Sequence, residues 1–415
     1  MNNFTLDQNG AIGSNAAANT AANLQRKSRS AIPEGSILKK LVDFAFAVPD
    51  FRRTGRGNHR HELGDIIMLM VLARMSKCVG RADIIEFGRH NLNRFKSIGL
   101  LKKGVPSEPT LCRVENGLDE LGFADSMADF IRGFYQELVR DSGQMEIICV
   151  DGKAMCGTVQ QNGRNPDIVS AYSHSTGMTL ATEACQEKSN EIKAVPLLIE
   201  KVDIAGKLVT ADAMSMQKDI IDKIRGKGGH FLIELKANQR SLRYGVEDKI
   251  KECRPMFSYT EGPELGHGRI ETRTYNVYDG LELIADKDKW GGNLTVVEFI
   301  SRSVKKSTGA EASESRLYVS SLPASTPWIG SAVRKHWSIE SMHWGLDFNM
   351  SQDSIKRKTP KAARNLDTLQ RVVFSLFSIW RGRRKKLSDK AKGVAQLMRT
   401  VSVSFTKLIR FLSQK

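Results

Sequence analysis

The sequence lacks a cysteine pattern for zinc, a long apolar run, and the common phosphate-loop and nucleophile-elbow motifs. Its six cysteines include no CxxC pair, and none has a histidine at zinc-finger spacing, so we expect no structural zinc ion. No window reaches the roughly 18 consecutive apolar residues of a membrane-spanning helix. The absence of GxxxxGK[ST] and GxSxG argues against P-loop and serine-hydrolase chemistry. Scattered cysteines without a secretory signal indicate a protein of the reducing cytoplasm.

Acidic residues are scarce only in the last fifth of the chain. The net charge is +17. Residues 1–150 hold 20 Lys/Arg and 17 Asp/Glu (20 − 17 = +3), and residues 151–330 hold 24 of each. Residues 331–415 hold 19 basic and 5 acidic residues (19 − 5 = +14). Such a concentrated positive field attracts polyphosphate backbones, so we expect double-stranded DNA as a partner; a solvated basic surface is the alternative.

The N-terminal third is predicted to be helical after a disordered start. Residues 1–30 contain few large apolar residues and cannot form a core, so we expect disorder there. Residues 31–140 are predicted to form a helical domain, which either binds DNA or serves as a packing module. Within it, the apolar run Leu63–Met75 predicts a buried helix, and Ser107 precedes a second helix entry.

Strand patterns begin near Glu146. The predicted order over 145–244 is three strands, a helix, a strand, a helix and a strand, which favours a mixed sheet with helices on its faces, as in a ribonuclease-H-like core. Residues 245–325 alternate apolar and polar residues and predict a β-rich insertion. Residues 326–385 are predicted to complete the core with two helices, and 386–415 to form a basic tail. The core strands are predicted at 146–151, 167–174, 178–185, 207–212 and 231–236, and the helices between them at 191–202 and 213–226. A further helix is predicted from Thr326-Pro327 to about 346. The last helix is predicted at 362–380, with a core of Leu366, Leu369, Val373, Leu376, Phe377 and Trp380. Ser189 or Asn190 is the expected cap of the helix at 191–202.

Two of the predicted buried strands end on an aspartate. Asp151 and Asp212 close strands that are neighbours in this topology. Unpaired carboxylates are costly to bury, and a divalent cation such as Mg²⁺ would remove that cost. The alternative is that each aspartate caps the turn after its strand.

A third acid lies on the helix that follows Thr326-Pro327. His336, Glu340, His343 and Asp347 are spaced by four, three and four residues, so they share one helical face. The alternative is a solvated polar face. Two Asp and one Glu are sufficient to hold two metal ions, one assisting the attacking water or 3′-hydroxyl and the other the leaving oxygen of a phosphodiester.

Six motifs in one order resemble a known family over residues 35–385. They are Val150-Asp151-Gly152-Lys153, Lys188-Ser189-Asn190-Glu191-Ile192, Thr210-Ala211-Asp212-Ala213, Leu235-Lys236-Ala237-Asn238-Gln239, His267-Gly268-Arg269-Ile270-Glu271, and His336-Trp337-Ser338-Ile339-Glu340 with His343-Trp344-Gly345-Leu346-Asp347. The chain resembles the H-repeat-associated family of DDE insertion-sequence transposases.

This resemblance implies a specific function and site. It implies a ribonuclease-H-like core, a β-insertion before the catalytic Glu, and a metal-binding triad of Asp151, Asp212 and Glu340. It also implies two Mg²⁺ ions, with Mn²⁺ able to substitute, and cleavage and joining of element ends. DNA ends and target DNA are the implied partners, in an assembly of two or more copies that is nucleoid-associated when bound. Candidate DNA contacts are Lys153, Lys236, Asn238, His336, His343, Arg381, Arg383, Arg384, Lys385 and Lys386.

The sequence departs from related DDE transposases at two positions of the catalytic helix. Relatives often carry Arg four residues before the Glu and a basic residue seven after it, where this chain has His336 and Asp347. Two alternative functions are also compatible with the sequence. One is a nuclease of the same fold that does not join strands, and the other is a non-catalytic DNA-binding protein descended from a transposase, against which the three intact acids count.

Overall fold

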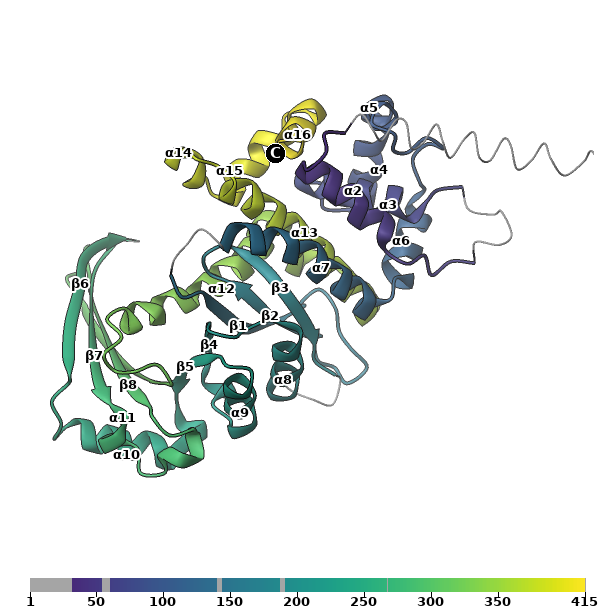
Figure 1. Cartoon of the computed structure of the whole chain (residues 1–415). Coiled ribbons are helices and arrows are strands. Elements are labelled where there is room, and N and C mark those ends of the chain that lie inside the picture. The colour runs from purple at the N-terminus through teal and green to yellow at the C-terminus, as the bar shows by residue number, and fades with distance from the viewer. Residues whose placement is uncertain (1–31, 54–59, 140–143, 187–190, 267, 415) are drawn as a thin grey trace, which may run out of the picture. The chain divides into compact units, whose positions relative to one another are not determined.

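A computed structural model describes all residues except 1–31, 54–59, 140–143, 187–190, 267 and 415, and it divides the chain into two compact units (Figure 1). A helical unit combines the chain up to Asp119 with Arg383–Lys415, and an α/β unit comprises Glu120–Gly382. The predicted disorder of 1–30 and the predicted helix cap at Ser189 or Asn190 lie outside the described residues. Among those described, no helix is both long and apolar enough to cross a membrane.

The helical unit is built around one helix that is buried on all sides. It is α3 (Leu63–Met75), and every residue of it is buried, which confirms the predicted buried helix. The positive charge of Arg74, in the last turn of α3, is compensated inside the unit by the buried Glu115, which pairs with it at 3.3 Å. The surrounding helices are α2 (Ile37–Ala47), α4 (Arg81–His90), α5 (Leu92–Ser97), α6 (Glu108–Gly117), α14 (Leu387–Lys390), α15 (Val394–Ser402) and α16 (Phe405–Leu412).

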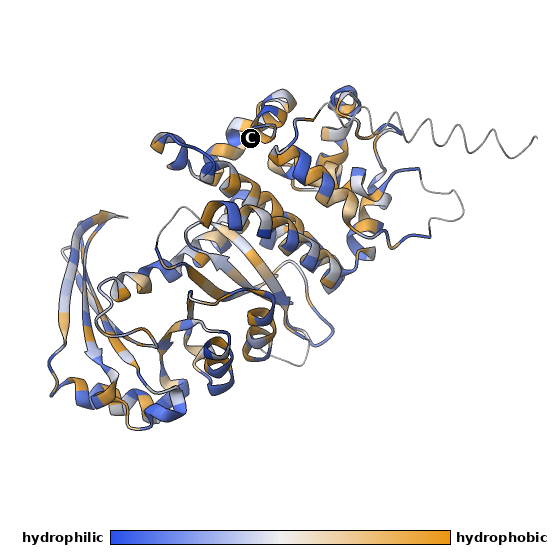
Figure 2. Ribbon diagram, viewed as in Figure 1, coloured by the Kyte–Doolittle hydropathy of each residue, from blue (hydrophilic) through white to orange (hydrophobic). Residues whose placement is uncertain are grey.

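The C-terminal segment is part of this unit, so the predicted basic tail at 386–415 is wrong. Helices α15 and α16 contact α3 and α2, and the Phe405 ring lies 4.7 Å from the Phe95 ring. Both helices are amphipathic, and Figure 2 shows hydrophobic as well as hydrophilic residues on them. Their buried residues, Val394, Leu397, Met398, Val401, Phe405, Leu408, Phe411 and Leu412, recur at helical spacing, a pattern that the high positive charge of the segment conceals.

The α/β unit contains one nine-stranded mixed sheet. Its order is β3-β2-β1-β4-β5-β9-β8-β7-β6. The β1–β4 and β4–β5 pairs are parallel and the others are antiparallel, which confirms the predicted mixed sheet. The strands are β1 (Ile147–Ala154), β2 (Asp167–Ser173), β3 (Met178–Ala184), β4 (Leu208–Ala211), β5 (His230–Leu235), β6 (Phe257–Gly266), β7 (Arg269–Asp279), β8 (Thr295–Lys305) and β9 (Glu311–Ser320).

Helices cover both faces of the core strands. Figure 1 shows α7 (Glu120–Val139), α12 (Ile329–Met350) and α13 (Pro360–Gly382) on one face, and α8 (Glu191–Lys201) and α9 (Lys218–Gly226) on the other. Helix α7 packs on β3 and α13, so it belongs to this unit and not to the helical N-terminal domain predicted to reach residue 140. The helix predicted over 213–226 begins only at Lys218, after a short 3-10 turn at Ala213–Ser215. Helix α12 begins at Ile329 and ends at Met350, a few residues later than predicted at each end.

The predicted β-rich insertion is continuous with the core sheet. Strand β9 pairs with β5, from Leu232 opposite Ser320 to Leu235 opposite Leu317, so β6 to β9 extend the sheet and are not a separate layer. Helix α10 (Arg240–Ile250) precedes them and was not predicted, because Val246 is its one buried residue and the apolar period is therefore weak. The short helix α11 (Gly280–Leu283) follows β7.

A buried polar network ties α12 to α13. The predicted apolar core of α13 is confirmed, but its buried residues also include charged ones. Arg371 Nε donates to Asp367 Oδ2 at 2.6 Å, and the two side chains are 0% and 1% exposed. Gln352 Nε2 donates to Asp367 Oδ1 at 3.0 Å, and Arg371 Nη1 lies 3.6 Å from Met342 Sδ of α12. This network therefore fixes the part of α12 that carries Glu340 and His343.

Candidate active site

Asp151 and Asp212 lie side by side where the parallel pairing of β1 and β4 ends, although β1 itself continues past the predicted end at Asp151 to Ala154. The parallel pairing of β1 with β4 ends at Val150 opposite Ala211, and Asp151 and Asp212 are the residues that follow this last pair. Side chains alternate along a strand, so Asp151 faces the same way as Cys149, and Asp212 the same way as Thr210. Both Cys149 and Thr210 contact α12, which places the two aspartates on the face that α12 covers.

Helix α12 presents its polar face to these strands. Cys149 Sγ donates to the Lys335 carbonyl at 3.4 Å, and Thr210 Oγ1 lies 3.0 Å from His336 Nδ1. About two turns later, His343 Nδ1 lies 3.5 Å from Asp151 Oδ2. Glu340 stands between the two histidines on this face, and the Asp151 charge contributes to its raised pKa. Glu340 is therefore on the same side of the sheet as Asp151.

Burial and mutual repulsion both act on the carboxylates of this site. Burial, and then the charge of Asp151, raises the pKa of Asp212 above its ordinary value, and the same two causes raise the pKa of Glu340. Burial lowers the pKa of both His336 and His343. The histidines are therefore neutral near pH 7 and do not offset the carboxylate charge.

A fourth carboxylate, Glu191, was missed by reasoning from the residues. It begins α8 and lies against Gly152, where a Cβ would overlap its carboxylate, so the glycine after Asp151 makes room for it. Burial, followed by the charges of Asp212 and Asp151, raises the pKa of Glu191 to about 7. The available signal was its place in the motif that starts at Lys188, but spacing alone did not connect that motif to the two aspartates.

The acids are neighbours without being gathered at ligand distance. Among the residues that the structure describes, no three His, Cys, Asp or Glu side chains are placed so as to hold a metal ion. Asp151, Asp212, Glu340 and Glu191 offer carboxylate oxygens, a donor type that suits Mg²⁺ or Mn²⁺.

Several of the predicted DNA contacts have partners within the chain. His336 contacts Thr210, His343 contacts Asp151, and Lys236 pairs with Glu234 at 2.9 Å. Lys153 Nζ pairs with Asp347 at 2.9 Å and with Asp353 at 3.1 Å, and its side chain is 9% exposed, so its charge is used to brace the end of α12. Asn238 Nδ2 donates to the Ala213 carbonyl at 2.6 Å, which holds the turn that follows Asp212. Lys153 and Asn238 therefore have positioning roles within the chain, and their contact with DNA stays a prediction.

Basic and aromatic side chains lie near Glu340. Lys236 is exposed and pairs with Glu234 at 2.9 Å, and the half-buried Arg316 pairs with Glu314 at 2.8 Å. Lys236 and Arg316 line a groove of about 570 Å³ with Arg243, and both cations lower the pKa of Glu340 as secondary effects. Trp344, one turn after Glu340, stacks on Phe348 at 4.6 Å, and the two rings are 59% and 67% exposed. Stacked exposed rings beside cations are a surface on which nucleobases stack.

The basic run at the end of α13 is divided between the two units. Arg381 belongs to the α/β unit, where its Nη2 donates to Ser378 Oγ at 3.3 Å. Arg383, Arg384, Lys385 and Lys386 belong to the helical unit.

Comparison with known proteins shows two family matches. Residues 142–370, which contain all four carboxylates, match the family "Transposase DDE domain", and residues 44–131 match the "DDE_Tnp_1-associated" family. The solved structure of a piggyBac transposase synaptic complex with hairpin DNA is 12% identical with a TM-score of 0.42, covering 93% of this chain and 81% of that chain. That likeness is too low to support a conclusion.

Two curated relatives match most of the chain. A putative transposase YncI of Escherichia coli O157:H7 is 31% identical, covering 86% of this chain and 92% of that protein. The H repeat-associated putative transposase YhhI of Escherichia coli K12 is also 31% identical, covering 82% of this chain and 91% of the relative. The chain therefore belongs to the DDE transposase family, and within it to the H-repeat-associated proteins.

Proposed function

We propose that this chain cleaves and joins DNA phosphodiesters at insertion-sequence ends at a site formed by Asp151, Asp212 and Glu340 on a ribonuclease-H-like core. One observation carries the proposal: two aspartates that follow the last paired residues of the parallel strands β1 and β4 face α12, the helix that carries Glu340 and contacts both strands. The partners would be double-stranded DNA at the element ends and at the target, bound by two or more copies of the chain.

The donor set fits Mg²⁺, with Mn²⁺ able to substitute. Asp151, Asp212 and Glu340 would hold the ions, whose charge would stabilise the phosphodiester as its bonds are exchanged. The protein's own contribution is orientation. Neutral His343 is within reach of Asp151 and holds that carboxylate at the face of α12, and His336 anchors α12 to β4 through Thr210. Glu191 adds negative charge from the other side of Gly152.

Divalent cations are expected to stabilise the folded protein more at pH 8 than at pH 5. The folded-state pKa of Glu191 is about 7 against an ordinary 4.5, so protonation favours the folded state, and that contribution disappears as pH rises through 7. At pH 8 the charge repulsion is complete, and Mg²⁺ relieves it. Binding at a hundredfold excess over Kd is worth about 2.7 kcal/mol. The measurement is the melting temperature with and without Mg²⁺ or Mn²⁺ at both pH values.

Sodium chloride at matched ionic strength is the control for screening. The same melts in Glu191→Gln should show a smaller difference between pH 5 and pH 8, because one titrating carboxyl is gone. A melting temperature that neither Mg²⁺ nor Mn²⁺ raises at pH 8 would contradict the metal site.

The basic run after α13 is expected to bind DNA phosphates. Neutralising Arg381, Arg383, Arg384, Lys385 and Lys386 together should weaken binding to all DNA sequences alike. The slope of log affinity against log salt should become shallower by about 0.9 for each phosphate that the variant no longer neutralises. Sequence choice should survive the five-fold change, because it would come from base contacts elsewhere, in residues 35–140.

Titrations at several salt concentrations measure both quantities. Neutralising Lys218, Lys223 and Lys227, near α9 on the sheet face away from α12, is the control and should leave the slope unchanged. Melting temperatures establish that the five-fold variant is folded. An unchanged affinity and slope in a folded variant would exclude the run from the DNA path.

A further inference from the structure

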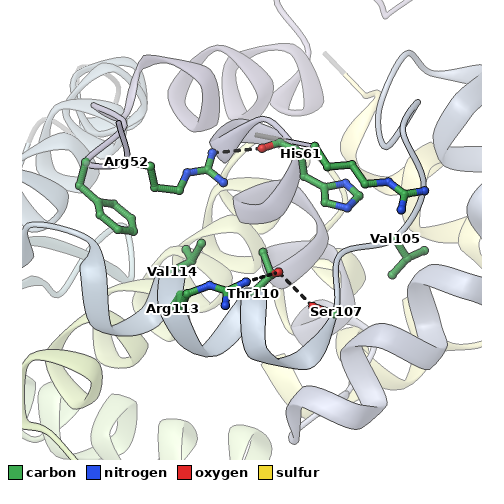
Figure 3. Close-up of a pocket in the computed structure, with 9 residues that line it drawn as sticks. Arg52, His61, Val105, Ser107, Thr110, Arg113 and Val114 are labelled. Atoms are coloured by element: carbon green, nitrogen blue, oxygen red, sulfur yellow. Dashed lines mark hydrogen bonds between the residues drawn. The ribbon is translucent and has the colours of Figure 1, made fainter. Parts of the chain in front are cut away.

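The helical unit contains a pocket that the proposed chemistry does not use. It has a volume of about 510 Å³ and is lined by Phe51, Arg52, Arg60, His61, Val105, Ser107, Thr110, Arg113 and Val114. Figure 3 shows Arg52 and His61 on one side and Ser107, Thr110 and Arg113 of the α6 region on the other. All the residues lie between 51 and 114, far in sequence from the carboxylates, so the pocket is a separate site.

The first turn of α6 forms one wall. Ser107 precedes the helix without capping it through its side chain, so the positive end of the helix dipole faces the pocket side that Ser107 and Thr110 line. Ser107 Oγ and Thr110 Oγ1 lie 3.0 Å apart, and Arg113 Nη2 donates to Thr110 Oγ1 at 3.1 Å. Hydroxyls, a guanidinium and a helix N-terminus together are donors suited to an anion with several oxygens.

His61 provides an independent indication of a ligand. The residue is only 8% exposed, and its buried Nδ1 has no hydrogen-bond partner in the described structure. Burial, and then the charges of Arg60, Arg52 and Lys103, lower the pKa of His61, so the ring is neutral. A buried polar atom without a partner is costly, and the His61 residue is part of the pocket wall.

The positive charge of the pocket is largely uncompensated. Arg52 is neutralised by Asp50 at 2.6 Å, and its Nη2 also donates to the His61 carbonyl at 3.1 Å, so it serves as a fixed wall. Arg60 Nε donates to the backbone carbonyl of Lys103 at 3.2 Å, a neutral acceptor that does not compensate the positive charge of Arg60. Within the described part of the chain, no carboxylate lies at ion-pair distance from Arg60 or Arg113. Two guanidiniums therefore remain for an anionic ligand.

We propose that this pocket binds a phosphate group of the DNA backbone, with Arg60, Arg113, the α6 N-terminus and His61 as its donors. These donors would recognise any tetrahedral phosphate, whether free or in DNA. We assign the phosphate to DNA because the proposal rests on the proposed transposase function. A phosphate fixed here would set the position of the duplex on the helical unit, independently of the metal-binding acids.

The test compares DNA binding by the full chain and by two matched double variants. Arg60→Ala/Arg113→Ala removes the pocket cations, and Arg94→Ala/Lys96→Ala removes two exposed cations of α5 in the same unit. Anisotropy titrations of a labelled duplex should show a loss of about tenfold for the pocket variant, because charge-assisted hydrogen bonds to the phosphate are removed. The salt slope should become shallower by about 0.9, the value for one phosphate. His61→Gln should weaken binding less.

Inorganic phosphate identifies the source of the ligand. If phosphate raises the melting temperature of wild type but DNA affinity is equal in all variants, the pocket binds free phosphate and the DNA assignment is overturned. Equal losses in the pocket and α5 variants would also overturn it, because general charge would then explain binding. A failure of the proposed catalysis can be distinguished from a failure of the pocket proposal. In the first case wild type would bind DNA but show no Mg²⁺-dependent cleavage, and the difference in DNA affinity between the pocket and α5 variants would still be measurable.

Discussion

Replacing Asp151 by Asn is expected to reduce Mg²⁺-dependent cleavage of element-end DNA by at least about 10³-fold, because several kcal/mol of metal-ion stabilisation of the transition state would be lost. The shape of the side chain is kept. The Gly152 N–H that donates to Asp151 Oδ1 at 2.9 Å would still find a carbonyl oxygen in the Asn variant. Fold and DNA affinity should therefore stay close to those of wild type. The measurements are end nicking and joining in Mg²⁺, a melting curve, and a DNA titration.

Asp203→Asn is the matched control. Asp203 pairs with Lys207 at 2.8 Å and is largely exposed, so the same chemical change there should leave cleavage unchanged. Asp212→Asn and Glu340→Gln should each behave like Asp151→Asn. Full activity of a folded Asp151→Asn protein, or cleavage by wild type in the presence of EDTA, would refute the metal-binding assignment.

Replacing Arg371 by Met is expected to cause the largest loss of stability. The change leaves Asp367 as an uncompensated charge at 1% exposure, and removing one partner of a buried pair costs about 3–5 kcal/mol. For a unit of this size the melting temperature should fall by roughly 10 °C. Thermal and urea unfolding measure the change.

A second substitution separates the ion pair from simple packing. In Asp367→Leu/Arg371→Met the buried charge is gone, and Gln352 Nε2 keeps Gln370 Oε1 as an acceptor at 2.9 Å. The double variant should recover most of the lost stability, since apolar replacements of buried pairs are often neutral. A double variant as unstable as Arg371→Met would show that packing volume at position 371, and not the unpaired charge, sets the cost.

Local pattern predicted the elements that position the acids. Apolar runs that end on Asp151 and Asp212, a polar stripe through Glu340, and the apolar period of α13 each depend on neighbours within a few residues. Strand order then followed from alternation of strands and helices, and it placed the two aspartates side by side. The motif order added the family, because six short motifs in one sequence are specific even when each alone is weak.

Contacts between residues distant in sequence decided the rest. Glu191, at the start of α8, lies against Gly152 of β1. Lys153 pairs with Asp347 and Asp353, and β9 pairs with β5. The basic C-terminal residues fold onto α2 and α3 because apolar burial outweighs the exposed charge that dominates the composition. The Nδ1 atom of His61 is left without a hydrogen-bond partner only through burial in the helical unit. Local sequence therefore determined which residues form each element, while long-range packing determined which side chains are desolvated together, and desolvation is what gives the site and the pocket their chemistry.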